Sequence, residues 1–293
     1  MLRKFVENKV QSNISASFVN KKRINLLKKF CGDDVGIAFE KAFESTFENI
    51  LDTIDEKTLK FVNFVTMIDN INDINDDNLP DYTLGNKKVH VIRNEKDLIK
   101  AVEQIKKSKV VGFDTEQKPI FTKGVPPSKI AIIQISDNKN CYIFQVHLIR
   151  NIRPVLDILS NSNIVKVGIG LNGDISALYN EFKVRLNACI DFGALFKAKM
   201  YYSNDIGAKR GVLLFLNQKL QKSKRISRSN WESEKLSDMQ IKYASEDAAC
   251  VHDMFCTMLV KYPFLVEILP HSFQDRYYKN YYDELLEDFK DFE

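Results

Sequence analysis

The sequence predicts an α/β fold in which helices flank a mixed β-sheet, preceded by a small helical region. Three apolar runs of strand length, at 109–114, 129–136 and 140–146, follow one another closely and indicate an antiparallel meander. Beyond residue 150 helical and strand patterns alternate, which adds further strands and places helices on both faces. With 293 residues, 44% hydrophobic and 28% charged, the chain suits one large domain or two smaller ones.

Residues 1–85 are predicted to form a helical N-terminal region of unknown role that begins with a basic arm. Residues 1–30 hold eight Lys or Arg against one acid. The arm is interpreted as an amphipathic helix, a disordered segment or a mitochondrial-type targeting segment. Apolar residues at helical spacing predict helices over 35–54 and 58–68. The Asn- and Asp-rich stretch that follows, up to Pro80, is typical of a linker.

Residues 86–265 carry the alternating pattern, and residues 266–293 are expected to be an acidic tail or helix. Besides the meander, the elements expected are a strand at 89–93, a helix at 95–107, a helix at 151–160, a strand at 164–169, a helix at 174–182 and a strand at 187–191. Helices are expected from there to the end of the chain.

Two carboxylates lie at the end of the first strand of the predicted meander. The run 110–113 leads into Asp114, and Glu116 follows two residues later. Side chains of a strand alternate between its faces, so we expect both acids on one face. Two anions at the end of a buried strand repel each other, and such oxygen ligands favour Mg²⁺ or Mn²⁺ over zinc. The pair indicates either a metal site or an ordinary strand that ends in solvated acids.

Two further acids lie where helices are predicted. Asp174 follows the apolar run 164–170, at the expected start of a helix, and is either a metal ligand or a residue that stabilises the helix N-terminus. Tyr243 and Asp247 lie one turn apart in a segment without Gly or Pro, so they share a helix face. The alternative for this pair is a core tyrosine beside a solvated acid.

The order and spacing of these residues resemble the DEDDy 3′–5′ exonucleases, a family that includes ribonuclease D and the Werner syndrome exonuclease. Segment 128–136 is similar to the family's second strand, and segment 189–192 resembles the strand before its next helix. The family's last motif is matched by Trp231, Leu236, Ser237, Gln240, Tyr243, Ala244 and Asp247. The likeness covers roughly residues 88–262. It departs from the family at 234–235, where Glu-Lys replaces the usual Arg-Pro, which puts an Arg contact to substrate in doubt.

The resemblance implies a ribonuclease H-like fold and a 3′–5′ exonuclease that uses two ions of Mg²⁺ or Mn²⁺. Asp114 would bridge both ions, Glu116 and Asp247 would complete the site that activates water, and Asp174 would hold the second ion directly or through water. Tyr243 would orient that water, because an unperturbed phenol titrates near pH ~10 and is a poor base.

Nucleic-acid contacts are expected from three places. Leu171 and Asn172, just before Asp174, are candidates for the terminal-nucleotide pocket. The loop after the metal strand offers Lys118, Phe121 and Lys123, and the basic stretch at 222–228 offers Lys222, Lys224, Arg225 and Arg228. Phosphate contacts would make binding fall steeply with salt. The simpler interpretation of both loops is solvated surface.

The substrate expected is the 3′ end of DNA or RNA, and the alternative function is a catalytically silent nucleic-acid-binding or scaffold protein on the same fold. The N-terminal helices are candidates for binding a protein partner. No apolar run is long enough to span a membrane. Five cysteines without metal-ligand spacing favour an intracellular location, nuclear or cytoplasmic, with a mitochondrial one as the alternative.

Two arrangements would contradict the metal-site hypothesis. One is a fold that holds the carboxylate oxygens far apart. The other is a basic side chain lodged between them.

Overall fold

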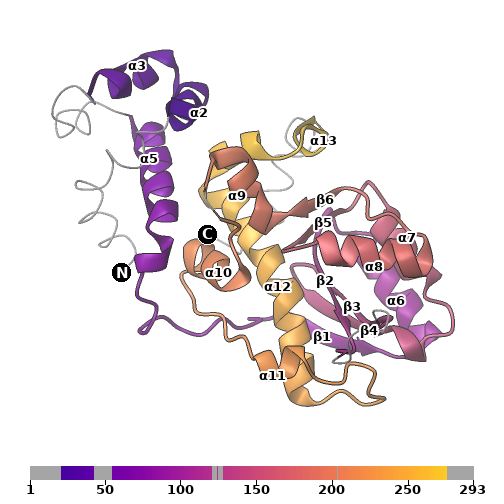
Figure 1. Ribbon diagram of the computed structural model, residues 1–293. Coiled ribbons are helices and arrows are strands. Elements are labelled where there is room, and N and C mark those ends of the chain that lie inside the picture. The colour runs from indigo at the N-terminus through magenta and orange to yellow at the C-terminus, as the bar shows by residue number, and fades with distance from the viewer. Residues whose placement is uncertain (1–20, 43–54, 121–123, 125–127, 203, 276–293) are drawn as a thin grey trace.

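A computed structural model describes residues 21–42, 55–120, 124, 128–202 and 204–275 (Figure 1). Its centre is a six-stranded sheet in the order β1-β4-β3-β2-β5-β6. The strands are β1 (Lys88–Ile92), β2 (Val110–Gln117), β3 (Ile130–Ser136), β4 (Asn140–Gln145), β5 (Val165–Gly168) and β6 (Cys189–Asp191). Strands β2, β3 and β4 form the predicted antiparallel meander, while β1 runs parallel to β4, and β5 and β6 continue parallel to β2. The mixed sheet is confirmed.

Helices cover both faces of this sheet (Figure 1). On one face lie α6 (Glu95–Ile105), α7 (Arg153–Ser160) and α8 (Asn172–Phe182), whose apolar residues pack with Val111 and Phe113 of β2. On the other lie α9 (Phe192–Met200), α10 (Ala208–Leu216), α11 (Lys224–Ser227) and the long α12 (Asp238–Lys261). Short turns complete the fold at η1 (Ile71–Asp73), η2 (Val146–Leu148), η3 (Pro263–Ile268) and α13 (His271–Phe273).

A glycine lets α12 lie directly on β2. A Cβ atom at Gly112 would fall well inside van der Waals distance of the Ala248 carbonyl oxygen, so no larger residue fits between strand and helix. Ser237 caps the first turn of α12 in a capping box with Gln240, which fixes where the helix begins. These two features place residue 247 above the end of β2.

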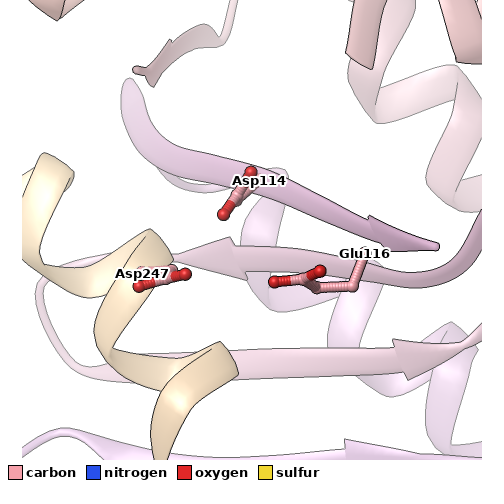
Figure 2. Close-up of side chains that lie close together, drawn as sticks. All are labelled: Asp114, Glu116 and Asp247. Atoms are coloured by element: carbon pink, nitrogen blue, oxygen red, sulfur yellow. The ribbon is translucent and has the colours of Figure 1, made fainter. Parts of the chain in front are cut away.

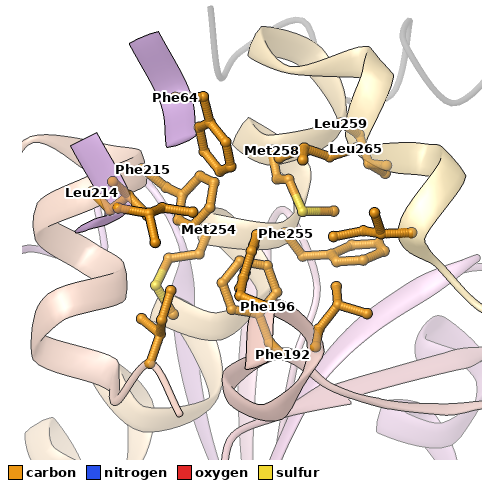
Figure 3. Close-up of a cluster of buried hydrophobic side chains, with 14 of the residues drawn as sticks. Phe64, Phe192, Phe196, Leu214, Phe215, Met254, Phe255, Met258, Leu259 and Leu265 are labelled. Carbon is orange, nitrogen blue, oxygen red and sulfur yellow. The ribbon is translucent and has the colours of Figure 1, made fainter. Parts of the chain in front are cut away.

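Of the N-terminal helices, two, α2 (Lys21–Cys31) and α5 (Glu56–Asp69), contribute to the core of the same body, and α3 (Asp33–Ala42) packs on α2. Phe64 of α5 lies beside aromatic residues of α9 and α10 in a cluster that also contains Phe255 of α12 (Figure 3). The predicted helix over 58–68 is confirmed as α5. Of the helix predicted over 35–54, α3 ends at Ala42 and residues 43–54 lie outside the described residues. Helix α2 was not predicted.

The first 20 residues and the expected acidic tail beyond residue 275 also lie outside the described residues. Within the described ranges, no helix combines the length and apolar character that crossing a bilayer requires. The domain boundary at residue 85 stays a prediction, and a single hydrophobic cluster extends across it.

Candidate active site

Three carboxylates converge where β2 lies against α12 (Figure 2). Asp114 and Glu116 project from the same face of β2, as their spacing predicts, and Asp247 projects from α12 toward them. One carboxylate oxygen from each residue lies within 4.8 Å of those of the other two. Their neighbour Phe113 points to the opposite face and is 1% exposed. The alternation of β2 therefore separates a polar site from the core at adjacent positions.

The fourth predicted ligand, Asp174, stands just outside this group. It lies in the first turn of α8 and accepts a hydrogen bond from the Thr115 hydroxyl, which projects from the other face of β2. Its charge still raises the pKa of Asp114, so the two carboxylates are within electrostatic reach. The Asp191 carboxylate accepts the backbone N–H of Gly170 and of Leu171, at 3.3 and 3.0 Å, and so fixes the turn that starts α8.

Burial and mutual repulsion raise the pKa values of these acids. Desolvation raises the pKa of Asp114 well above its ordinary range, and the charges of Asp247 and Asp174 raise it further. Desolvation and the charge of Asp114 raise the pKa of Glu116 to about 9. Burial also raises the pKa of Asp247, against the opposing effect of Lys222. The site thus disfavours several carboxylate charges at once unless a cation joins them.

Lys222 is the cation that faces this charge. Its ammonium pairs with an oxygen of Asp247 and lies 5.0 Å from the centre of the Tyr243 ring. Burial alone would lower the pKa of Lys222, but Asp247 raises it above its ordinary value. The sequence grouped Lys222 with an exposed basic loop. The structure instead turns it into the acidic site, because Leu220 and Ile226 on either side of it are buried.

A basic side chain at the carboxylates is one of the two arrangements that would contradict a metal site. Lys222 meets that condition only in part, because among the described residues its ammonium pairs with a single carboxylate, that of Asp247. The carboxylate oxygens of Asp114, Glu116 and Asp247 still lie together. An all-carboxylate donor set of this kind fits a hard divalent ion.

Tyr243 stands beside the carboxylates as a neutral phenol. Burial, and then the charge of Asp247, raise its pKa to about 12. The Trp231 ring packs against the Tyr243 ring, with 6.0 Å between the ring centroids. The Trp231 indole N–H donates to the Ser227 carbonyl at 3.1 Å. The tyrosine is therefore held in place as a neutral phenol, and its role in orienting water stays a prediction.

The residues expected to contact nucleic acid are distributed unevenly. Lys224, Arg225 and Arg228 are exposed on and just after α11, and Asn172 is exposed at the start of α8. Lys118 is exposed but pairs with Glu232, with 3.2 Å between ammonium and carboxylate. Leu171 differs from expectation: it is 1% exposed and packs in the core, so its side chain offers no surface to a nucleotide. Phe121 and Lys123 lie outside the described residues.

Solved structures share this fold. RNase D of Escherichia coli superposes with a TM-score of 0.55 at 20% identity, over 70% of this chain and 50% of that one. The catalytic core of RRP6 from Trypanosoma brucei superposes with a TM-score of 0.56 at 19% identity, over 67% and 53% of the two chains. The predicted ribonuclease H-like architecture is confirmed.

Sequence relatives point to one family. The chain is 34% identical over 140 residues to a 3′–5′ exonuclease of Arabidopsis thaliana, and 33% identical over 142 residues to the bifunctional 3′–5′ exonuclease/ATP-dependent helicase WRN of Mus musculus. Each alignment covers 47% of this chain, and they cover 48% and 10% of the relatives. Residues 89–262, more than half of the chain, match the family model described as 3′–5′ exonuclease. The chain therefore belongs to the 3′–5′ exonuclease family, whose members are metal-dependent enzymes that act on nucleic acids.

Proposed function

We propose that this chain removes nucleotides from the 3′ end of single-stranded or 3′-tailed DNA or RNA, using two ions of Mg²⁺ or Mn²⁺. One observation carries the proposal: the carboxylate oxygens of three residues from β2 and α12 converge, in surroundings that disfavour their charges unless a cation joins them. Carboxylates that are held close together repel each other, which lowers the stability of the fold. Binding of a cation between them relieves this repulsion.

The carboxylates would hold the ions, and the other residues would position the reactants. Bound divalent ions would polarise the phosphate and lower the pKa of the attacking water. Asp114, Glu116 and Asp247 supply oxygen ligands from one face of β2 and from α12, and Asp174 stands beside Asp114 to complete the set. The neutral Tyr243 phenol donates a hydrogen bond and so orients the water.

The approach to this site would bind the phosphates of a single strand. Lys224, Arg225 and Arg228 are exposed and have no acidic partner among the described residues. Replacing all three with Gln should weaken oligonucleotide binding and flatten its salt dependence, since each lost phosphate contact reduces the slope by nearly one. Binding isotherms measured at several salt concentrations test this. An unchanged slope would mean that the segment is ordinary solvated surface.

The activity is tested with matched 5′-labelled DNA and RNA oligonucleotides that carry a 3′ overhang. In Mg²⁺ or Mn²⁺ we expect a ladder that shortens from the 3′ end, and in EDTA no shortening. The RNA and DNA lanes decide the substrate, and parallel Mg²⁺ and Mn²⁺ lanes decide the ion. Asp247→Ala should abolish the ladder, and a fully active Asp247→Ala enzyme would refute the assignment.

The ion pair between Lys222 and Asp247 is the one observation that favours a catalytically silent protein. A lysine that permanently occupied the site would leave nucleic-acid binding intact and prevent metal binding. The same oligonucleotides separate the two functions, because a silent protein would shift them in a gel without shortening them.

Two further predictions concern the cell rather than the site. All five cysteines are free thiols, in keeping with the proposed intracellular location. We also propose that the N-terminal helices bind a protein partner, which a pull-down with and without residues 1–42 would test.

A further inference from the structure

The cation beside the carboxylates belongs to the chain itself. We propose that Lys222 is the resident counter-ion of the metal-free site and that an incoming divalent ion displaces it from Asp247. Lys222 would then set the concentration of metal at which the enzyme becomes loaded. The inference rests on the proposed function, because it takes the ligand of the site to be a divalent ion.

The side chain of Lys222 is only partly enclosed. Its side chain is 25% exposed, whereas that of Asp247 is 5% exposed. It has one carboxylate partner among the described residues, and its other neighbour is the face of the Tyr243 ring. Lys87 differs on both counts. It is 5% exposed, pairs with Asp253 at 3.0 Å and also donates to the Asp137 carbonyl. Lys87 is a structural lysine, while Lys222 has a route to solvent.

The backbone around Lys222 is nevertheless fixed. The Lys219 N–H donates to the Pro80 carbonyl at 2.9 Å, and the Tyr82 N–H donates back to the Lys219 carbonyl at 2.8 Å. Leu220 is 2% exposed, and Ser223 caps α11 on the other side. Displacement therefore requires only rotation of the lysine side chain and no movement of the main chain.

Electrostatics makes the two cations compete. An ammonium and a divalent ion in contact with the same carboxylate would repel each other strongly in a site with so little water. Without either cation, the clustered carboxylates could keep their charges only at a high cost in free energy. The ammonium thus stabilises the metal-free state, and its removal from Asp247 subtracts from the free energy of metal binding.

Titration of the nucleic-acid-free protein with Mn²⁺, followed by calorimetry, tests the competition. Lys222→Met should bind Mn²⁺ on the order of tenfold more tightly than the wild type, because one competing charge is gone. Lys224→Met is the matched control, since it removes an equal charge that is exposed two residues away, and its affinity should stay within about twofold of the wild type. Equal or weaker binding by Lys222→Met would overturn the proposal.

Amine footprinting tests the displacement in the wild-type protein, so it does not depend on the folding of a variant. Acetylation of Lys222, read by mass spectrometry, should be slow in EDTA and several-fold faster in saturating Mg²⁺, while that of Lys224 stays constant. Equal Lys222 rates in the two conditions, with Mg²⁺ bound, would overturn the inference and leave the nuclease proposal intact. A protein that binds no divalent ion at all would overturn both.

Discussion

Helix α12 takes part in two buried charge clusters that differ in how their carboxylates are paired. Around Asp253, the Tyr82 hydroxyl donates at 2.7 Å, the Lys87 ammonium lies at 3.0 Å and the His252 ring nitrogen lies at 3.0 Å. Burial raises the pKa of Asp253, but these partners outweigh it and the pKa lies below its ordinary value. Around Asp247, nearly two turns earlier, the carboxylates of Asp114 and Glu116 lie close by, and burial raises the pKa although Lys222 and Tyr243 oppose the shift.

The difference teaches that burial alone does not mark a functional acid. Asp253 is buried and satisfied, and it joins the segment before β1 to α12. The carboxylates beside Asp247 share one lysine among them, and binding of a metal ion would relieve their mutual repulsion. Substitutions in the two clusters should therefore differ in their effects on activity and on stability.

Asp114→Asn should have the largest effect on activity. We expect a loss of three or more orders of magnitude in kcat, as is usual when a catalytic group is removed. Thermal stability should hold or rise, because one of several repelling buried charges is gone. Exonuclease assays and melting curves on one preparation measure both. If the variant instead lost activity because it unfolded, the Asp114 carboxylate would have a structural role like that of Asp253.

Asp253→Asn should have the largest effect on stability. It leaves the buried Lys87 without its carboxylate, and breaking such a pair costs about 3–5 kcal/mol of unfolding free energy. Urea unfolding measures the loss. The folded fraction should keep its exonuclease activity, and selective loss of activity would place Asp253 in the catalytic machinery instead.

The two clusters should respond to pH in opposite directions. In the metal-free protein the folded state keeps the Glu116 proton up to a pKa of about 9, while the unfolded chain loses it near its ordinary value of 4.5. Unfolding then releases a proton, so this contribution to stability falls as pH rises between those values. Asp253 has a lowered pKa, so its contribution is lost as pH falls through that value.

Urea unfolding in EDTA at several pH values, with Glu116→Gln as the control, isolates the Glu116 contribution. Saturating Mg²⁺ should flatten the wild-type dependence between neutral and alkaline pH, since bound metal keeps the carboxylates deprotonated. A wild-type slope that Glu116→Gln leaves unchanged would assign the effect to another group.

A pair of tyrosine variants should give the smallest effects. Tyr82→Phe removes a buried hydrogen bond to Asp253 and should cost about 1–2 kcal/mol with kcat unchanged. Tyr243→Phe should lower kcat and leave stability nearly unchanged, because the ring still packs on Trp231. Equal behaviour of the two variants would argue against a separate role for Tyr243.

Local pattern was sufficient to predict the sheet and most of the carboxylate site. The alternation of β2 places Asp114 and Glu116 on one face whatever the tertiary structure does. The helical spacing of Tyr243 and Asp247 orients them together for the same reason.

The remainder depends on contacts between distant segments. Lys222 belongs to a basic stretch, and only the pairing of residue 219 with the segment before β1 turns it inward. Leu171 lies three residues before Asp174, a predicted metal ligand, yet the turn held by Asp191 directs it into the core. The network of Tyr82, Lys87 and Asp253 joins residues more than 160 positions apart, which no local pattern reveals.

The aromatic contacts of α5 have a practical consequence for anyone who expresses this nuclease. A recombinant fragment that starts at residue 86 would keep every side chain of the proposed active site. It would also lack Phe64, and so would expose the rings of Phe215, Tyr262 and Phe264 that pack on it. Apolar aromatic rings that become exposed to solvent promote aggregation. A fragment trimmed to the catalytic unit should therefore aggregate more readily than the longer chain.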